Sequence, residues 1–270
     1  QLHKDLNCFY LLNRIYLHYN NLQKDVSMKD YLLDIVQHTH SLGFISLVKI
    51  TGDDKETTIE GLAEDRSVIL KGKFHKTVPE FIGTFGMPNL DKLGIILKIS
   101  EYASDAKISI NTQERNGADV PVGIHFENAG GDFQNDYRFM ASEIVNDKLK
   151  SVTMKDVKWS VEFAPTVASI QRLRMQISAN SDEGTFIAKT EGKDLVLHFG
   201  DASTHAGNFV FQHDVGGKLD RGWAWPVDQV SKILSLGGDI DYKISDDGVT
   251  EITVDSGLGS YRYLLPAQSK

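Results

Sequence analysis

The sequence holds a single cysteine, Cys8, among 270 residues. One cysteine excludes an internal disulfide and excludes metal sites that need several thiolates, so a reducing compartment fits best. Long apolar runs are missing as well. The most apolar stretch near the start, 8–19, is interrupted by Asn13, Arg14 and His18, which makes it too short and too polar to span a bilayer. We therefore expect a cytoplasmic protein without a membrane anchor.

Positive charge is in deficit. Lys and Arg total 29 against 37 for Asp and Glu, which gives a net charge of −8. Proteins that hold nucleic acid on a broad basic surface depend on Lys and Arg to release counterions from phosphates. The acidic surplus argues against such a surface, so any contact with nucleic acid must be confined to one local basic face.

Motifs that mark catalysis are absent from the sequence. There is no P-loop, no G-x-G-x-x-G after a β-rich stretch and no G-x-S-x-G elbow for a nucleophile. His38 and His40 are two positions apart, which on a helix points them to different faces and away from a shared metal. Paired aspartates such as Asp53-Asp54 are typical of solvated turns. We expect no enzyme activity, no cofactor and no metal site.

What the sequence does have is regular amphipathic patterning. Hydrophobic residues make up 41% and charged residues 24%, as in soluble globular proteins, and 270 residues allow two domains of ordinary size. Helical periodicity follows Ser27, a good N-cap, and continues to Gly43. Further helices are predicted from Pro88, from Pro165 and over 227–236.

Between the helices the sequence is rich in β-branched and aromatic residues, in short stretches separated by Gly, Asn and Asp. Asn116-Gly117 and Asp247-Gly248 are typical of the short turns that join hairpin strands. Strands are predicted at 44–50, 57–62, 67–74, 106–112, 122–127, 137–144, 157–163, 185–190, 194–199, 208–213, 223–226, 241–245, 250–254 and 261–265.

The second half repeats the first in outline. The helix opened by Leu90 and Asp91 is matched by one opened by Val227 and Asp228, and the apolar positions that follow agree without a gap. We therefore predict an α+β fold of two similar domains, each with two helices packed on antiparallel sheets. The predicted boundaries are an N-terminal extension at 1–26, a first domain at 27–146, a linker at 147–156 and a second domain at 157–270.

Three segments carry a family resemblance: TVPEFIGTFGMPNLDKLGIILKI (77–99), NDYRFMASEIVND (135–147), and the stretch from WAWPVDQVSKIL to YRYLLPA (223–267). In these segments, and in the order and spacing of its elements from about 27 to 267, the chain resembles the DNA sliding clamps of contractile-tailed phages, relatives of the proliferating cell nuclear antigen. The resemblance implies the DNA-clamp fold and a homotrimeric ring of six domains, with helices around a central hole.

The resemblance also implies a function. Clamps of this kind are processivity factors in DNA replication and not enzymes. Their partners are double-stranded DNA of any sequence, a DNA polymerase and a clamp loader. For a phage protein, the expected location is the cytoplasm of the host cell.

A DNA-facing surface should lie on the helices that line the hole. Such a surface needs only weak, sequence-independent contacts to phosphates. The alternative is that exposed helix faces carry Lys and Arg for solubility alone. The candidate residues, accompanied by the polar Gln171 and Gln176, are Lys29, Lys92, Lys98, Arg172, Arg174 and Lys232.

A second site is implied only by the resemblance: partner proteins insert a short apolar peptide into a groove beside the linker. Apolar side chains at such a place can anchor a peptide, or they can simply seal the linker onto the sheets. The candidate residues are Met140, Ile144, Val145, Leu149, Leu264, Leu265 and Pro266.

Two other functions stay open on the sequence alone. A phage structural or assembly protein built from duplicated β-rich domains would oligomerise without a basic, helix-lined hole. A hydrolase without a recognised motif would need a concave pocket with converging ionisable groups, which the sequence does not indicate.

Overall fold

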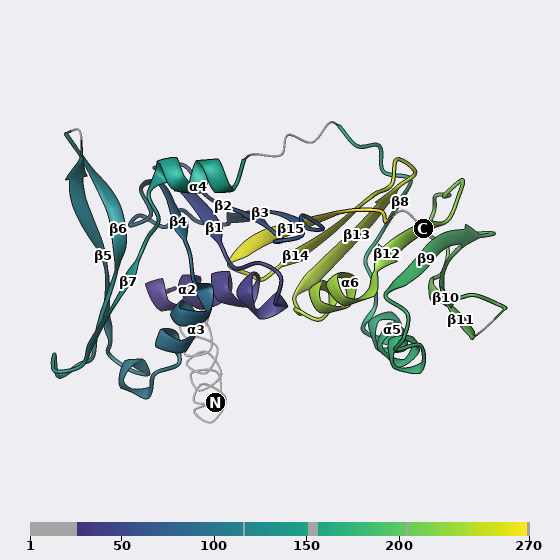
Figure 1. Ribbon diagram of the computed structural model, residues 1–270, viewed down its shortest axis with the longest axis horizontal. Helices are drawn as coiled ribbons and strands as arrows, with labels where there is room; N and C mark the ends of the chain where they lie inside the picture. The colour runs from purple at the N-terminus through teal and green to yellow at the C-terminus, as the bar shows by residue number, and fades with distance from the viewer. Residues whose placement is uncertain (1–25, 116, 151–155, 204, 269–270) are drawn as a thin grey trace, which may run out of the picture.

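The computed structural model describes residues 26–115, 117–150, 156–203 and 205–268 (Figure 1). Within these residues helices pack on antiparallel sheets, which confirms the α+β class predicted from the sequence. The first half contains α2 (Met28–Gln37), β1 (Val48–Gly52), β2 (Thr57–Leu62), β3 (Ile69–Phe74), β4 (Gly83–Met87), α3 (Leu90–Leu97), β5 (Lys107–Arg115), β6 (Ala118–Glu127), β7 (Gln134–Arg138) and α4 (Ser142–Lys148).

The second half begins with a strand where the first half, as described, begins with a helix. It contains β8 (Val161–Phe163), α5 (Val167–Ala179), β9 (Thr185–Glu191), β10 (Asp194–Gly200), β11 (Ala206–Gln212), β12 (Trp223–Pro226), α6 (Val227–Leu234), β13 (Asp239–Ser245), β14 (Val249–Asp255) and β15 (Gly259–Pro266). Two short 3₁₀ helices, η1 (His40–Leu42) and η2 (Ser100–Tyr102), lie in the first half.

The strands form three sheets. An eight-stranded sheet has the order β4-β1-β2-β3-β15-β14-β13-β8, a four-stranded sheet has the order β11-β10-β9-β12, and a three-stranded sheet has the order β5-β6-β7. The eight-stranded sheet spans both halves, because β3 of the first pairs with β15 of the second. A continuous row of backbone hydrogen bonds therefore joins the halves.

The two halves share one topology. In the first, β1-β2-β3 form a meander and β4 pairs with β1; in the second, β9-β10-β11 form a meander and β12 pairs with β9. A helix then follows in each, α3 or α6, and after it a second meander, β5-β6-β7 or β13-β14-β15. The duplication predicted from the sequence is present in this order, while the exact domain boundaries stay a prediction.

Local chemistry explains where the first helix starts and which side it buries. Ser27 accepts a hydrogen bond from the Asp30 backbone, and the Asp30 carboxylate accepts one from the Ser27 backbone, so the capping box satisfies two terminal donors. Tyr31, Leu32 and Ile35 then face the core at helical spacing. In the strands the core residues alternate with outward-facing ones, as in β2, where Thr57, Ile59 and Gly61 are buried.

The structure differs from the sequence prediction around residue 140. The predicted strand at 137–144 is confirmed only at 137–138, because β7 ends at Arg138 and α4 begins at Ser142. The predicted linker at 147–156 accordingly begins inside α4, and 151–155 lie outside the described residues. Val145 is the one buried side chain of α4. Because α4 buries so little, the sequence of this segment lacks the apolar periodicity that would indicate a helix.

One further strand was missed, and the predicted start of one helix is wrong. β4 was not predicted, because Gly83 and Gly86 lower the intrinsic β propensity of this segment; its pairing with β1 along five residues forms the strand. Pro165 is not the first helical residue, since Thr166 is the N-cap of α5 and accepts a hydrogen bond from the Ser169 backbone.

Candidate functional site

Four helices form a row along one side of the sheets. α2 contacts α3, η1 at the end of α2 contacts α6, and α6 contacts α5, so the order along the row is α3-α2-α6-α5. Figure 1 shows these helices below the sheets and α4 above them. We call the first side the helix row and the second the outer face.

The helix row is the more basic part of an acidic chain. The four helices, with Lys98 at the end of α3, carry six basic and four acidic side chains. Their balance is positive, although the whole chain carries a net charge of −8. Weak, sequence-independent contacts to phosphates require a local excess of positive charge of this kind.

The two arginines predicted to face DNA are exposed and oriented by the protein. Arg172 donates from Nη1 to the Val210 carbonyl at 3.2 Å, and its guanidinium lies 5.3 Å from the centre of the Phe209 ring. Arg174 donates from Nη2 to Ser235 Oγ at 3.0 Å. Each retains further N–H donors for a phosphate, since a guanidinium has five.

The four lysines predicted for the same surface differ in their surroundings. Lys92 and Lys98 are exposed on α3 and at its C-cap. Lys29 is half-buried and donates to the Tyr102 carbonyl at 2.5 Å. Lys232 pairs with Asp228 one turn earlier at 2.8 Å, which offsets its charge and makes it the weakest candidate.

A cavity of about 490 Å³ opens on the helix row between α5 and the connection from α6 to β13. Its walls are largely apolar, including Val167, Ile170 and Ile240, and its ionisable lining residues are Arg174 and Asp239. With no histidine and a single carboxylate in its lining, the cavity lacks the paired groups that general acid and base catalysis requires.

The outer face carries an apolar row across three strands. Leu62 of β2 pairs with Ile69 of β3, and Ile69 pairs with Leu264 of β15. Their strand neighbours Leu70 and Leu265 point into the core, so these three side chains face the other way. Leu264 is 3% exposed yet lies outside the main core, which shows that the outer face has packing of its own.

Of the residues predicted to form a partner groove, Leu149 and Leu264 meet this row. Leu149 lies beside Leu62 and Ile69 around a small hollow of about 20 Å³. Leu62 and Ile69 were not among the groove residues predicted from the sequence; the signal for them was an apolar residue at an outward position of each strand. We call Leu62, Ile69, Leu149 and Leu264 the outer apolar row.

The other predicted groove residues are distributed differently. Val145 is buried against Gly86, where α4 packs on β4, and Leu265 is part of the core. Neither side chain is available to a partner. Met140 is half-buried beside Gly86 and bridges its backbone, and Ile144 and Pro266 are exposed.

Ion pairs border the outer apolar row. Glu251, 3% exposed, accepts two hydrogen bonds from the Arg262 guanidinium, and Lys49 pairs with Glu60. Burial disfavours the charge of Lys243, but its hydrogen bond to Glu162 and the charges of the surrounding carboxylates together outweigh that effect and raise the pKa of Lys243. The row is thus an apolar strip between charged side chains, as at many protein interfaces.

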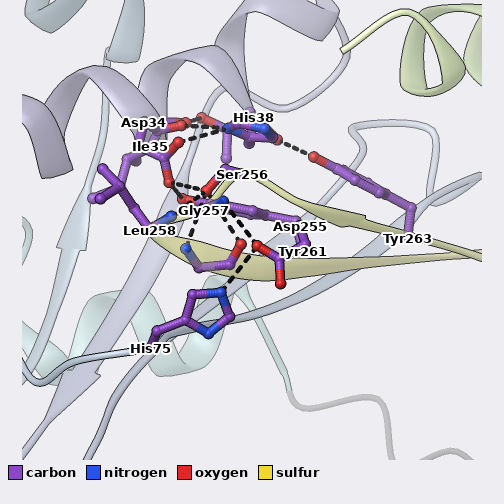
Figure 2. A network of polar contacts seen from close by, with 12 residues as sticks. Asp34, Ile35, His38, His75, Asp255, Ser256, Gly257, Leu258, Tyr261 and Tyr263 are labelled. Atoms are coloured by element: carbon purple, nitrogen blue, oxygen red, sulfur yellow. Dashed lines mark hydrogen bonds and ion pairs between the residues drawn. The ribbon is translucent and has the colours of Figure 1, made fainter. Parts of the chain in front are cut away.

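A buried polar cluster connects α2 of the first half to β15 and the turn before it in the second half (Figure 2). The Asp34 carboxylate, on α2, accepts hydrogen bonds from Tyr261 Oη at 2.7 Å and Ser256 Oγ at 3.0 Å. His38 stacks on Tyr261 with ring centres 4.3 Å apart, and Tyr263 donates to the His38 carbonyl at 2.7 Å. Burial and the Asp34 charge raise the pKa of Tyr261 well above its ordinary value.

This cluster brings Ser, His and Asp together without the geometry of a hydrolase. His38 Nδ1 lies 2.9 Å from the Asp34 carbonyl and 3.3 Å from its carboxylate. Ser256 Oγ donates to the same carboxylate and accepts from the Leu258 and Gly259 backbones. A nucleophilic serine must form a hydrogen bond with the histidine that activates it. Here Ser256 and His38 each contact the Asp34 carboxylate. The cluster therefore links the two halves of the chain.

Neither a metal site nor a membrane span is present in the residues that the structure describes. They contain no group of three or more His, Cys, Asp or Glu side chains placed to hold a metal ion. Nor do they contain a helix that is long and apolar enough to cross a membrane.

Comparison with solved structures identifies the fold. The structure of A. fulgidus PCNA with the C-terminal region of FEN-1 bound is similar with a TM-score of 0.65 and 10% identity, over 88% of this chain and 96% of that one. The chain has the sliding-clamp fold. PCNA from Thermococcus kodakaraensis gives a TM-score of 0.62 at 12% identity, over 90% and 97% of the two chains.

PCNA from Entamoeba histolytica gives a TM-score of 0.59 at 11% identity, over 89% of this chain and 94% of that one. These solved clamps are archaeal and eukaryotic. No protein-family model matches the sequence, and no curated protein sequence is significantly similar to it. The phage resemblance accordingly stays a prediction from the sequence, whereas the clamp fold is confirmed.

Proposed function

We propose that the chain is a DNA sliding clamp, of which three copies close head to tail into a ring around duplex DNA and tether a DNA polymerase to its template. The observation that carries this proposal is the pairing of β3 with β15 inside one chain. That pairing is a joint between two similar halves, and the same joint can be made again between copies.

Two edge strands would form the repeated joint. By the shared topology, β11 corresponds to β3 and β7 corresponds to β15. In the described residues β11 and β7 are edge strands of their sheets. Antiparallel pairing of β11 in one copy with β7 in the next would extend the four-stranded sheet into the three-stranded one. A heterologous joint of this kind makes a ring when its rotation closes.

A ring of six domains would need three copies of this two-domain chain. With two halves per copy, three copies supply six helix pairs, and the helix row of each copy would face the hole. The basic residues there, Arg172 and Arg174 above all, would contact phosphates without reading bases. The excess of Asp and Glu lies outside the helix row, and this negative charge would disfavour DNA binding on the outside of the ring.

The outer apolar row is the proposed site for partner peptides. Among the similar structures, one holds the C-terminal region of FEN-1 on A. fulgidus PCNA. An apolar strip bordered by ion pairs supports the same use here, for a polymerase and for a clamp loader. Ile144 and Pro266, both exposed, would flank the bound peptide.

Molar mass in solution tests the ring. Light scattering should give three times the 30.1 kDa of the chain in the micromolar range. Val210→Asp, on β11, should release monomers because it places a charge at the joint. Val249→Asp, a half-buried valine of the central strand β14, should leave the mass unchanged. A wild-type monomer at high concentration would refute the ring.

A further inference from the structure

A row of charged side chains crosses the outer face next to the outer apolar row. Lys71 of β3 lies opposite Glu60 of β2 on one side and opposite Arg262 of β15 on the other. Lys71 is two residues along β3 from Ile69, so both side chains point to the same face of the sheet. A charged row and an apolar row therefore run side by side across β2, β3 and β15.

The carboxylates near the charged row are already bound to other cations. Glu60 pairs with Lys49, and Glu251 of β14 accepts two hydrogen bonds from the Arg262 guanidinium. Lys71 forms no ion pair or side-chain hydrogen bond with any residue that the structure describes. The cations of this group therefore exceed its carboxylates by one, and the excess charge is that of Lys71.

Lys71 is half-buried, so the lack of a partner is costly. It lines the small hollow of the outer face together with Leu62, Ile69 and Leu149. An ammonium group that is partly withdrawn from water loses hydration, which a carboxylate can replace. A ligand that brings both apolar side chains and a carboxylate to this place would satisfy the apolar row and the cation together.

The other lysines nearby already have partners. Lys73, the next outward residue of β3, pairs with Glu56 at 2.6 Å, and Lys150 pairs with Asp147 at 3.6 Å. Residues 151–155, which follow Lys150 in the sequence, contain no Asp or Glu. Charge complementarity at Lys71 therefore points to a carboxylate that arrives with a ligand.

The position of Lys71 along the apolar row decides which carboxylate can reach it. Ile69 is the middle residue of the row, with Leu62 and Leu264 on the strands to either side, about 4.8 Å away. Lys71 is on the same strand as Ile69 and so lies level with the middle of the row. A peptide that covers the row passes Lys71 partway along its length, where the side chain of an internal residue reaches the ammonium and the peptide's end does not.

We propose that Lys71 is a specificity-determining residue of the outer apolar row, where it binds an Asp or Glu side chain placed between the apolar residues of a partner peptide. This inference rests on the proposed function, because it requires that the outer apolar row binds partner peptides. It adds that the row selects among apolar peptides by charge. A peptide with an uncharged residue at that position binds more weakly, and one with a lysine more weakly still.

A phage-displayed library of random peptides, selected on the full chain, tests the charge requirement. Peptides selected on the wild type should share apolar residues with an Asp or Glu between them. Peptides selected on Lys71→Gln should keep the apolar residues and lose the acidic one. Lys73→Gln, the same change at a lysine of the same strand that already has a partner, should select the wild-type pattern.

A synthetic peptide with the selected sequence measures the size of the effect. Lys71→Gln should weaken its binding about fivefold in fluorescence anisotropy, as expected for a partly exposed ion pair. Replacing the acidic residue of the peptide by its amide should weaken binding to the wild type equally and have no further effect on Lys71→Gln. Such a double-mutant cycle isolates the contact, because a general change in the fold would not depend on the charge of the peptide.

A second variant locates the peptide on the outer apolar row. Ile69→Thr keeps a β-branched side chain but removes apolar area, so it should weaken binding of the synthetic peptide. Ile95→Thr, the same change at a 65% exposed position on α3, should leave binding unchanged. If Ile69→Thr had no effect, or if selection yielded no apolar pattern, the partner site of the proposed function would fail and this inference with it.

Other outcomes would overturn the role of Lys71 alone and leave the partner site in place. These outcomes are an apolar pattern without an acidic residue, an acidic residue outside the apolar ones, and an acidic residue that persists in the Lys71→Gln selection. Acidic selection that appears only after Asp5→Asn with Asp25→Asn would also overturn it, because the partner of Lys71 would then be a carboxylate of the chain itself.

Discussion

The structural role of some residues in this chain can be predicted from residue type and position in the sequence, whereas that of others cannot. Ser27 was predicted as an N-cap and is one, because capping depends on local geometry. Asp34 and Ser256, by contrast, are far apart in the sequence and meet through tertiary packing alone. No local pattern indicates such a contact. The same holds for Leu265, whose burial depends on which face of β15 meets the core.

Asp34 should contribute more to the stability of the fold than a carboxylate in an exposed turn. Asp34→Asn leaves the side chain in place but removes the charge that Tyr261 and Ser256 bond. We expect the free energy of unfolding to fall by about 1.5–3 kcal/mol, measured by urea denaturation. Asp54→Asn, in an exposed turn, should change it by less than about 0.5 kcal/mol. If Asp34→Asn lowered the free energy of unfolding as little as Asp54→Asn does, the contacts of Asp34 with Tyr261 and Ser256 would not be important for stability.

Asp255 should contribute to acid sensitivity. The hydrogen bond from His75 and the one from the Gly257 backbone lower the pKa of Asp255. A carboxyl whose pKa is lower in the folded state than in the unfolded state stabilises the fold above its unfolded pKa of about 4. That contribution is lost as the pH falls through the lowered folded pKa.

The measurement is the free energy of unfolding between pH 7 and pH 3. Asp255→Asn should be less stable than the wild type at neutral pH, and the two should converge toward pH 3. Asp54→Asn is the matched control and should run parallel to the wild type. Curves for Asp255→Asn that stay parallel to the wild type would contradict a lowered pKa as the cause.

Helices and strands with a strong apolar periodicity could be predicted from the sequence. Those that form through their tertiary contacts could not. β2 and β12 match the predicted ranges, and α2, α3, α5 and α6 were all expected. α4 and β4 were missed, because each is formed by what it packs or pairs against and not by its own periodicity. The helix row was expected from resemblance, and the structure gives it the order α3-α2-α6-α5.

The α3 end of the helix row should contribute to salt-dependent DNA binding. Lys92→Ala with Lys98→Ala should weaken binding to duplex DNA of any sequence. The slope of log affinity against log salt should become shallower by roughly 0.9 for each phosphate that the variant no longer neutralises. Binding is measured by fluorescence anisotropy at several salt concentrations.

The matched control lies on the outer face. Lys71→Ala with Lys73→Ala removes the same charge from outward positions of β3. These changes should leave both affinity and salt slope close to those of the wild type. An equal loss of affinity in both double variants would mean that net charge alone, and not the helix row, governs DNA binding.

For the whole molecule, the sequence predicted the class, the duplication and the clamp fold, and the structure agrees with all three. What the sequence could not supply is how the halves are joined. The β3–β15 pairing and the matching edges at β7 and β11 depend on strand order, which follows from long-range pairing. From that order comes the proposal that copies join as the halves do.

Electron micrographs of the purified chain would test this most directly. Class averages should show closed rings with six similar lobes and a central hole, each copy contributing two neighbouring lobes. Single elongated particles, or compact assemblies in which the helix rows pack against each other and leave no hole, would contradict the ring and with it the proposed function.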